Sequence, residues 1–150
     1  MALAPARTLD ERLRDTRDHF ENDEDTWVST ADAHTPYLVP LSFLWDGEAF
    51  VISTVATSPT SRNLTATGGV RLAFGGTRDV VLVEGTATLL TEDQVKDGAG
   101  DAFAAKTGWD PRTENGTYHF FKISPRRVQA WREVNELAGR DLMKQGRWLG

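Results

Sequence analysis

From Asp25 to about residue 134, the chain consists mainly of short runs rich in Val, Thr, Trp and Phe with a period of two, separated by turn residues. This pattern is typical of β-strands. A series of antiparallel strands with few helices favours a closed or nearly closed barrel, because closure removes exposed strand edges. We expect six or seven strands, and the candidate runs cover residues 26–31, 37–45, 48–54, 70–74, 80–90, 118–123 and 127–134.

Three segments carry helix signals. Thr-x-x-Glu and Thr-x-x-Gln capping boxes open helices at about residues 9–21 and 92–106. A Ser-Pro pair opens a shorter helix at 59–67, which ends at a glycine pair. We therefore expect a mainly β (α+β) fold with short helices, in a single domain over residues 1–150 whose C-terminal tail spans 135–150.

Two of the predicted strands are apolar on both faces. In residues 37–45 every odd position is large and apolar, and the even positions include Leu38, Pro40 and Leu44. Residues 80–90 show the same pattern. A small monomeric barrel should keep one polar face toward water, so the outer face of these strands should also be covered. A second copy of the chain is the simplest cover, and we expect a homodimer.

Composition excludes several classes of function. The 150 residues contain no Cys, and the three His lie far apart, which removes thiol nucleophiles and leaves no visible set of metal ligands. A net charge of −5 argues against nucleic-acid or anionic-membrane partners. No apolar stretch approaches the ~18 residues of a membrane-spanning helix and no signal peptide is recognisable, so we expect a cytoplasmic protein. Hydrolase elbows and Gly-rich phosphate loops are missing too, and the catalytic residues stay unassigned.

Residues 53–64 are the most informative segment, since they pass from a strand end through a hydroxyl-rich loop to a helix start. A helix N-terminus offers unpaired amide groups and the positive end of the helix dipole. Here Ser and Thr hydroxyls and the Arg62 guanidinium surround it, which fits a phosphate or carboxylate site. The alternative is that Ser58 only caps the helix and Arg62 points to solvent.

Trp131 is a second candidate. It lies with Arg127 and Gln129 on the polar side of the last predicted strand. A tryptophan on a polar face usually covers a partner subunit or a flat ligand. The alternative is packing beneath the C-terminal tail.

Three motifs in order carry a family resemblance: Pro40-Leu41-Ser42-Phe43, then Thr54-x-x-x-Ser58-x-x-x-x-Asn63-Leu64, then a Phe-x-Ile-x-Pro-x-x-Val-x-x-Trp ending over residues 121–131. Together they resemble the FMN-binding split-barrel superfamily, which contains pyridoxamine 5′-phosphate oxidase-like proteins and flavin or deazaflavin oxidoreductases. The resemblance covers about residues 9–131. It implies a homodimer of split β-barrels with two cofactor sites at the interface, holding FMN or, alternatively, the deazaflavin coenzyme F-420.

The resemblance also implies the site residues. The cofactor phosphate would contact Thr54, Ser58 and the helix start, and the ring system would lie along the strand that bears Pro40. Trp131 would approach from the other subunit. The family motif commonly continues Ser-x-Lys, and the lysine position here is Thr60. The implied cofactor-binding residues are Pro40, Leu41, Ser42, Ser53, Thr54, Ser58, Thr60, Arg62, Asn63 and Trp131.

Three functions follow from these observations. The first is a flavin- or deazaflavin-dependent oxidoreductase that acts on a small substrate, in which the protein supplies binding and orientation and the cofactor supplies the chemistry. The second is a protein that binds a flavin, haem or another planar ligand without turnover. The third is a dimeric barrel that has lost its cofactor, for which Thr60 is the main argument.

Overall fold

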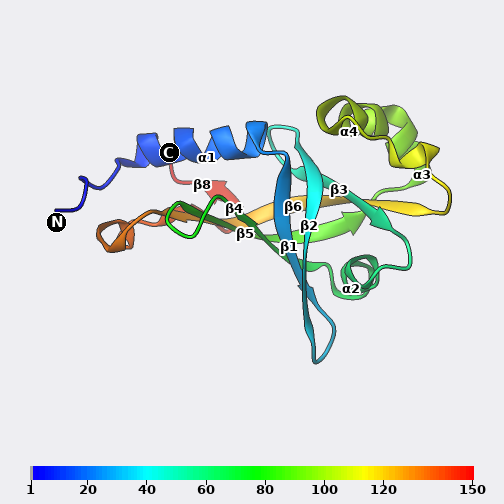
Figure 1. Ribbon diagram of the computed structural model, residues 1–150, viewed down its shortest axis with the longest axis horizontal. Helices are drawn as coiled ribbons and strands as arrows, with labels where there is room; N and C mark the ends of the chain where they lie inside the picture. Colours follow the sequence, from blue (N-terminus) through cyan, green and yellow to red (C-terminus); the bar gives the residue numbers. More distant parts are fainter. Residues whose placement is uncertain (1) are drawn as a thin grey trace.

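The computed structural model describes residues 2–150 and contains a closed barrel of six antiparallel strands, in the order β3-β2-β1-β4-β5-β6 (Figure 1). Pairing of β6 with β3 closes the barrel. The predicted mainly β split-barrel fold is confirmed. The barrel strands are β1 (Asp25–Ala31), β2 (Pro36–Trp45), β3 (Phe50–Val55), β4 (Gly69–Phe74), β5 (Val80–Leu89) and β6 (Tyr118–Trp131).

The turn between β2 and β3 forms at Asp46 and Gly47, between the predicted strands at 37–45 and 48–54. The Asp46 carboxylate accepts hydrogen bonds from the backbone amides of Glu48 and Ala49, both at 2.8 Å. Gly47 has φ +98°, a conformation that L side chains rarely adopt. The turn residues therefore fix the hairpin that carries the motifs of residues 40–43 and 53–64.

The last barrel strand differs from the sequence prediction. Residues 118–123 and 127–134 were expected to form two strands, but β6 runs unbroken from Tyr118 to Trp131. Pro125, which lacks an amide hydrogen, lies where the β5–β6 register shifts between Glu84 and Gly85. The irregularity absorbs the proline without ending the strand. Val134 lies beyond it, in a 3-10 turn (Val134–Glu136).

Aromatic side chains fill the barrel interior. Phe43, Phe50 and Phe74 come from three different strands, and each is at most 3% exposed. Phe20 of α1 (Leu9–Asn22) joins them with no exposed surface, and its ring centroid lies 4.8 Å from that of Phe50. Helix α1, whose predicted capping box is present, therefore covers one open end of the core.

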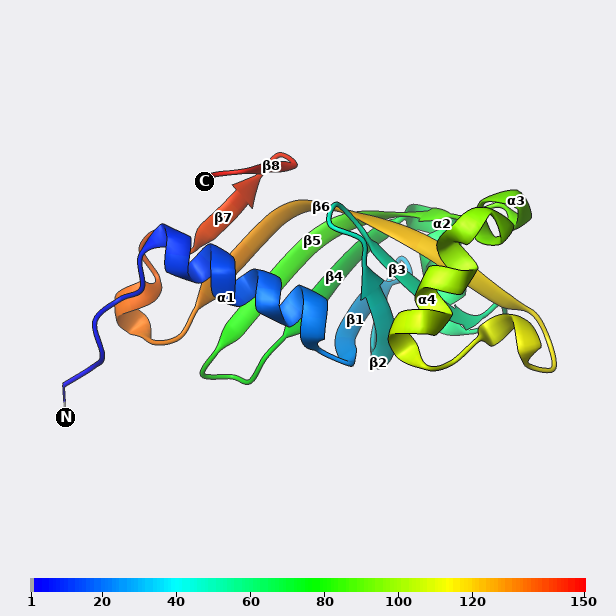
Figure 2. The same cartoon turned by 90° about the horizontal axis from the view of Figure 1, so that it is seen from above.

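The other helices lie around the barrel. Figure 1 shows α2 (Pro59–Thr67) on the side away from α1, and Figure 2 shows α1 and α4 (Gly100–Thr107) on the same side of the sheet. The single helix expected at residues 92–106 is broken into α3 (Glu92–Gln94), a kinked turn (Val95–Ala99) and α4. The break occurs at Gly98, whose φ is +129°. Within residues 2–150, no helix has both the length and the apolar character that a membrane span requires.

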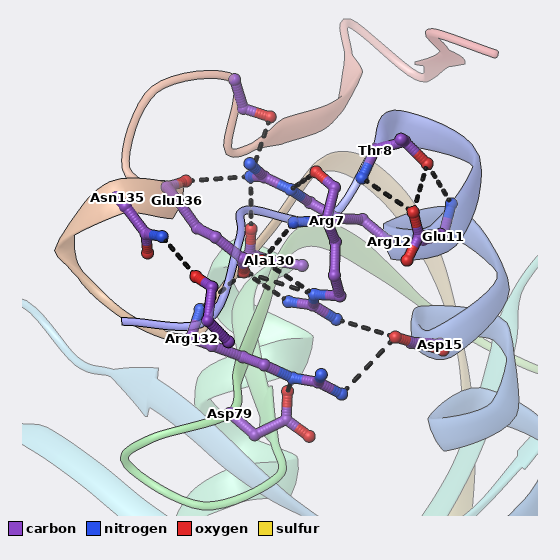
Figure 3. A network of polar contacts seen from close by, with 12 residues as sticks. Arg7, Thr8, Glu11, Arg12, Asp15, Asp79, Ala130, Arg132, Asn135 and Glu136 are labelled. Carbon is purple, nitrogen blue, oxygen red and sulfur yellow. Dashed lines mark hydrogen bonds and ion pairs between the residues drawn. The ribbon is translucent and has the colours of Figure 1, made fainter. Parts of the chain in front are cut away.

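Residues 135–150 contain two strands that the sequence did not predict, β7 (Asp141–Lys144) and β8 (Arg147–Trp148). β7 pairs with the second half of β6, and β8 pairs with β7. Arg7 binds the Glu136 carboxylate at 2.7 and 3.0 Å, and Arg12 donates to the backbone carbonyls of Ala130, Glu136, Ala138 and Gly139 (Figure 3). This network holds the N-terminal segment against the segment that follows β6.

Candidate functional site

The hairpin of β2 and β3 places half of the predicted site residues around one hollow of about 290 Å³, which we call the strand hollow. Pro40, Leu41 and Ser42 come from β2, and Ser53 and Thr54 come from β3. The remaining wall was not predicted. It consists of Asp25, Val55, Trp109 and Tyr118.

A cluster of hydroxyl groups continues from the strand hollow to α2. The Oγ1 atom of Thr54 lies 3.0 Å from the Oγ atom of Ser58. Ser58 is the N-cap of α2, and its Oγ atom also accepts a hydrogen bond from the backbone amide of Ser61 at 3.1 Å. Only one of the two hydroxyl hydrogens is used between Thr54 and Ser58, so the other remains able to bind an acceptor.

Beyond the cluster lies a second hollow, of about 500 Å³, which we call the helix hollow. Arg62 and Asn63 of α2 line it, together with Tyr37 of β2. Tyr37 and Pro40 lie three residues apart on β2, so the two hollows share this strand, although the odd separation points the two side chains to opposite faces of it. The fold therefore gathers two separate sequence motifs along one strand.

The local geometry is that of the alternative interpretation, in which Ser58 caps the helix and Arg62 points to solvent. Ser58 does cap the helix, and Arg62 is exposed and donates to the backbone carbonyl of Thr57 at 2.7 Å. Thr60, at the position of the family lysine, is 1% exposed. Asn63 donates through its Nδ2 atom to the Thr30 hydroxyl at 3.1 Å, which ties α2 to β1. Arg62 is thus the cation that faces the helix hollow.

Each hollow also contains one acidic side chain. Asp25 accepts a hydrogen bond from the Ser42 hydroxyl at 3.1 Å in the strand hollow. Asp32 accepts backbone hydrogen bonds from His34 and Thr35 in the helix hollow, and these bonds lower the pKa of its carboxyl below the ordinary value. Asp32 therefore stays negatively charged, which favours placing an anionic group near Arg62 and the start of α2 rather than beside Asp32.

Trp131 is not part of either hollow within one chain. Thr54 pairs with His119 near the start of β6, whereas Trp131 pairs with Val80 at the far end. The intervening strand is roughly 40 Å long. The ring of Trp131 is half-buried, and the Arg140 guanidinium lies 5.8 Å from its centroid.

Sequence reasoning did not identify His119, Tyr118 or Trp109 as site residues. His119 is opposite Thr54 in the β3–β6 pairing, and its Nδ1 atom lies 2.8 Å from the Ser61 hydroxyl. Tyr118 packs edge-on against Trp109, with ring centroids 5.4 Å apart. Their role depends on which two strands close the barrel, and the local pattern of β6 gives no signal for that choice.

Comparison with known proteins adds an independent result. The sequence matches the family model of pyridoxamine 5′-phosphate oxidase over residues 15–132. No curated protein matches it.

Solved structures share the fold at low sequence identity. A provisionally named pyridoxamine 5′-phosphate oxidase of Listeria innocua is 15% identical with a TM-score of 0.63, covering 85% of this chain and 98% of that one. A FAD-binding protein of Mesorhizobium loti is 17% identical with a TM-score of 0.64, covering 77% and 89% of the two chains. An F-420 reductase is 15% identical with a TM-score of 0.60, covering 75% and 94%. At these identities the likeness concerns the fold.

Proposed function

The chain belongs to the pyridoxamine 5′-phosphate oxidase family, and on that premise we propose that it is a flavin- or deazaflavin-dependent oxidoreductase acting on a small molecule. One observation carries the proposal. Residues of two separate motifs, 40–42 and 53–63, line two hollows that share strand β2. The names of the FAD-binding protein and the F-420 reductase among its structural neighbours support a cofactor of this type.

The donor groups fit an elongated ligand with an anionic end. Arg62 supplies a positive charge, the Thr54–Ser58 pair supplies a free hydroxyl hydrogen, and the amide of Thr60 lies in the first turn of α2, where helical partners are absent. Pro40 and Leu41 offer the strand hollow an apolar wall for a ring system. A bound flavin or deazaflavin would supply the hydride or electron transfer, and the protein would bind and orient it.

The proposal includes a homodimer with cofactor sites at its interface. At about 290 Å³ the strand hollow is smaller than the roughly 300–1,000 Å³ of typical ligand sites. The outer face of β1 and β2 beside it exposes 48% of Trp27 and 59% of Leu38. A second copy placed on this face would bury these side chains and deepen the site. Trp131 of that copy would then cover the ring.

Titration of the purified protein with FMN, riboflavin and coenzyme F-420, followed by absorbance and fluorescence, tests the proposal. We expect micromolar binding of FMN or F-420. Arg62→Ala should weaken FMN binding by about three- to tenfold because the phosphate loses a cation, while the affinity for riboflavin, which has no phosphate, should not change. Arg78→Ala removes a cation that is exposed and paired with Glu133, and serves as the control.

The outcomes separate the possible functions. If neither cofactor binds, the proposal fails and loss of the cofactor site is the better explanation. Thr60 favours that explanation, since the buried hydroxyl cannot replace a lysine charge. If a cofactor binds, chemical reduction followed by addition of small acceptors distinguishes an oxidoreductase, whose cofactor is reoxidised faster than free cofactor, from a non-catalytic binder of flavin, haem or another planar ligand.

A further inference from the structure

A third hollow, of about 450 Å³, adjoins the strand hollow at Tyr118. We call it the end hollow, because it is formed where β5 ends and β6 begins, beside α3 and the kinked turn at Val95–Ala99. Tyr118 lines both hollows. The end hollow contains none of the residues that the sequence motifs single out, and the proposed function leaves it without a role.

The wall of the end hollow is mainly apolar and favours neither an anionic nor a cationic ligand. Leu89, Leu90 and Phe120 form its apolar side. Arg112 also lines it, but this guanidinium is already bound to Asp101 at 2.7 Å and Asp110 at 2.8 Å. Lys96 and Glu92 are exposed at the rim and offset each other. A neutral, flat molecule suits these walls better than an ion.

One polar side chain in this wall, His119, is held by a hydrogen bond to a buried neighbour. Ser61 has no exposed surface, and its hydroxyl lies 2.8 Å from the Nδ1 atom of His119. Within residues 2–150 the Ser61 hydroxyl has no other hydrogen-bond partner, so it donates to Nδ1 and the ring hydrogen of His119 lies on Nε2. His119 lines the end hollow, and in this tautomer its ring carries one N–H donor, at Nε2.

The backbone beside the hollow is irregular. Val95 and Lys96 line the hollow from the segment between α3 and α4, which leaves the helical conformation at Asp97 and Gly98. The turn ends in the kink at Gly98, where an added Cβ atom would meet nothing within 4 Å. The kink places Val95 over the hollow while α4 continues in another direction.

We propose that the end hollow binds the small substrate, a neutral planar molecule whose hydrogen-bond acceptor is bound by the Nε2–H group of His119. The assignment to the substrate rests on the proposed function, because this ligand site becomes a substrate site by adjoining the strand hollow, with which it shares Tyr118. His119 and the apolar wall act in binding. Ser61 is a positioning residue that fixes the ring of His119.

The neutral fluorophore 6-propionyl-2-dimethylaminonaphthalene, which has a planar apolar body and one carbonyl acceptor, is a suitable probe. We expect the emission maximum of the probe to move to shorter wavelength when it binds to the wild-type protein. His119→Phe keeps an aromatic ring but removes the donor, and should weaken binding by about three- to tenfold. Leu89→Glu should also weaken it, because Leu89 is 41% exposed and the new charge can enter the wall without disturbing the core. Leu89→Glu keeps the test valid if the His119 variant does not fold.

Leu149→Glu is the matched control, because Leu149 is 48% exposed and lies outside the end hollow. Unchanged probe affinity in Leu149→Glu together with weaker binding in Leu89→Glu supports the proposal. The reverse pattern places the probe elsewhere on the surface and overturns it. Equal affinity in wild type, His119→Phe and Leu89→Glu also overturns it.

The same samples titrated with FMN and F-420 separate this inference from the proposed function. The inference predicts that probe and cofactor bind together and that the cofactor quenches the fluorescence of the nearby probe. If the cofactor expels the probe, they share one site and the inference fails although the proposed function stands. If the probe binds in the end hollow and neither cofactor binds, the proposed function fails, and with it the assignment of this hollow to a substrate.

Discussion

At the scale of single residues, the Glu136 carboxylate shows how strongly one buried group can depend on its partners. Its side chain is 4% exposed and accepts hydrogen bonds from the Arg7 guanidinium, the Arg7 amide and the Arg132 amide. The Arg7 side chain is the main reason that the pKa of Glu136 falls to about 2. The charged form is therefore the stable one in the folded protein.

Replacing Glu136 with Gln should lower the free energy of unfolding by about 1.5–3 kcal/mol, because the Arg7 guanidinium loses its closest counter-charge and keeps only the ion pair with Asp15. Chemical denaturation measures the change. Glu133→Gln is the control, since Glu133 pairs with Arg78, whose side chain is 80% exposed, and its loss should cost less than about 1 kcal/mol. Equal losses in the two variants would contradict the role assigned to Glu136.

The same carboxylate gives a pH dependence with a definite sign. The pKa of Glu136 is about 2 in the folded protein, compared with its ordinary value of 4.5. Its contribution to stability is thus fully present above pH 4.5 and lost as the pH falls toward 2. We expect the difference in unfolding free energy between wild type and Glu136→Gln to shrink over this interval. A difference that stays constant would exclude Glu136 as its source.

At the scale of elements, the turn between β4 and β5 depends on one glycine. Gly75 has φ +75°, and a Cβ atom there would lie 2.0 Å from the carbonyl oxygen of Asp79. Gly75→Ala should therefore destabilise the fold by more than the ~1–2 kcal/mol cost of the left-handed conformation alone. Gly47→Ala, at φ +98° with nothing within 4 Å, should cost only that amount. Thermal unfolding of both variants tests the comparison, and a smaller loss for Gly75→Ala would contradict it.

Elements with strong local signals were predictable. The helix expected at 9–21 is α1 at Leu9–Asn22, and the strand expected at 37–45 is β2 at Pro36–Trp45. β7 was missed because its four residues carry no marked alternation and gain their structure from pairing with β6. The break of the helix expected at 92–106 was missed because a capping box marks where a helix begins, and nothing local to Gly98 distinguishes a kink from a tolerated glycine.

The part of the candidate site that neighbouring segments form was predictable from the sequence. The motif residues of β2, β3 and α2 meet because a hairpin and the next helix are neighbours in sequence. Tyr118 and His119 were missed because they reach the site through the pairing of β3 with β6, more than sixty residues apart. Pairing at that distance is set by closure of the whole barrel and not by the local pattern.

At the scale of the whole molecule, the exposed apolar face of β1 and β2 is the feature that a second copy would cover. Leu38→Lys should shift the proposed dimer to monomer, since a charge there would have to be buried at the interface. Size-exclusion chromatography with light scattering measures the mass. Val134→Lys is the control, because Val134 is 70% exposed in a different segment. A monomeric wild-type protein, or a Leu38→Lys variant that remains dimeric, would exclude this interface.

The length of β6 implies that two inactive variants of this chain can complement each other in a mixed dimer. If one chain supplies the strand hollow near the start of β6 and its partner supplies Trp131 from the end, each copy contributes half of two different sites. Ser42→Trp, which fills the strand hollow, and Trp131→Ala should then each abolish both sites of a homodimer. A mixed dimer of the two variants would carry one doubly defective site and one intact site, so two inactive chains should complement each other and bind one cofactor per dimer.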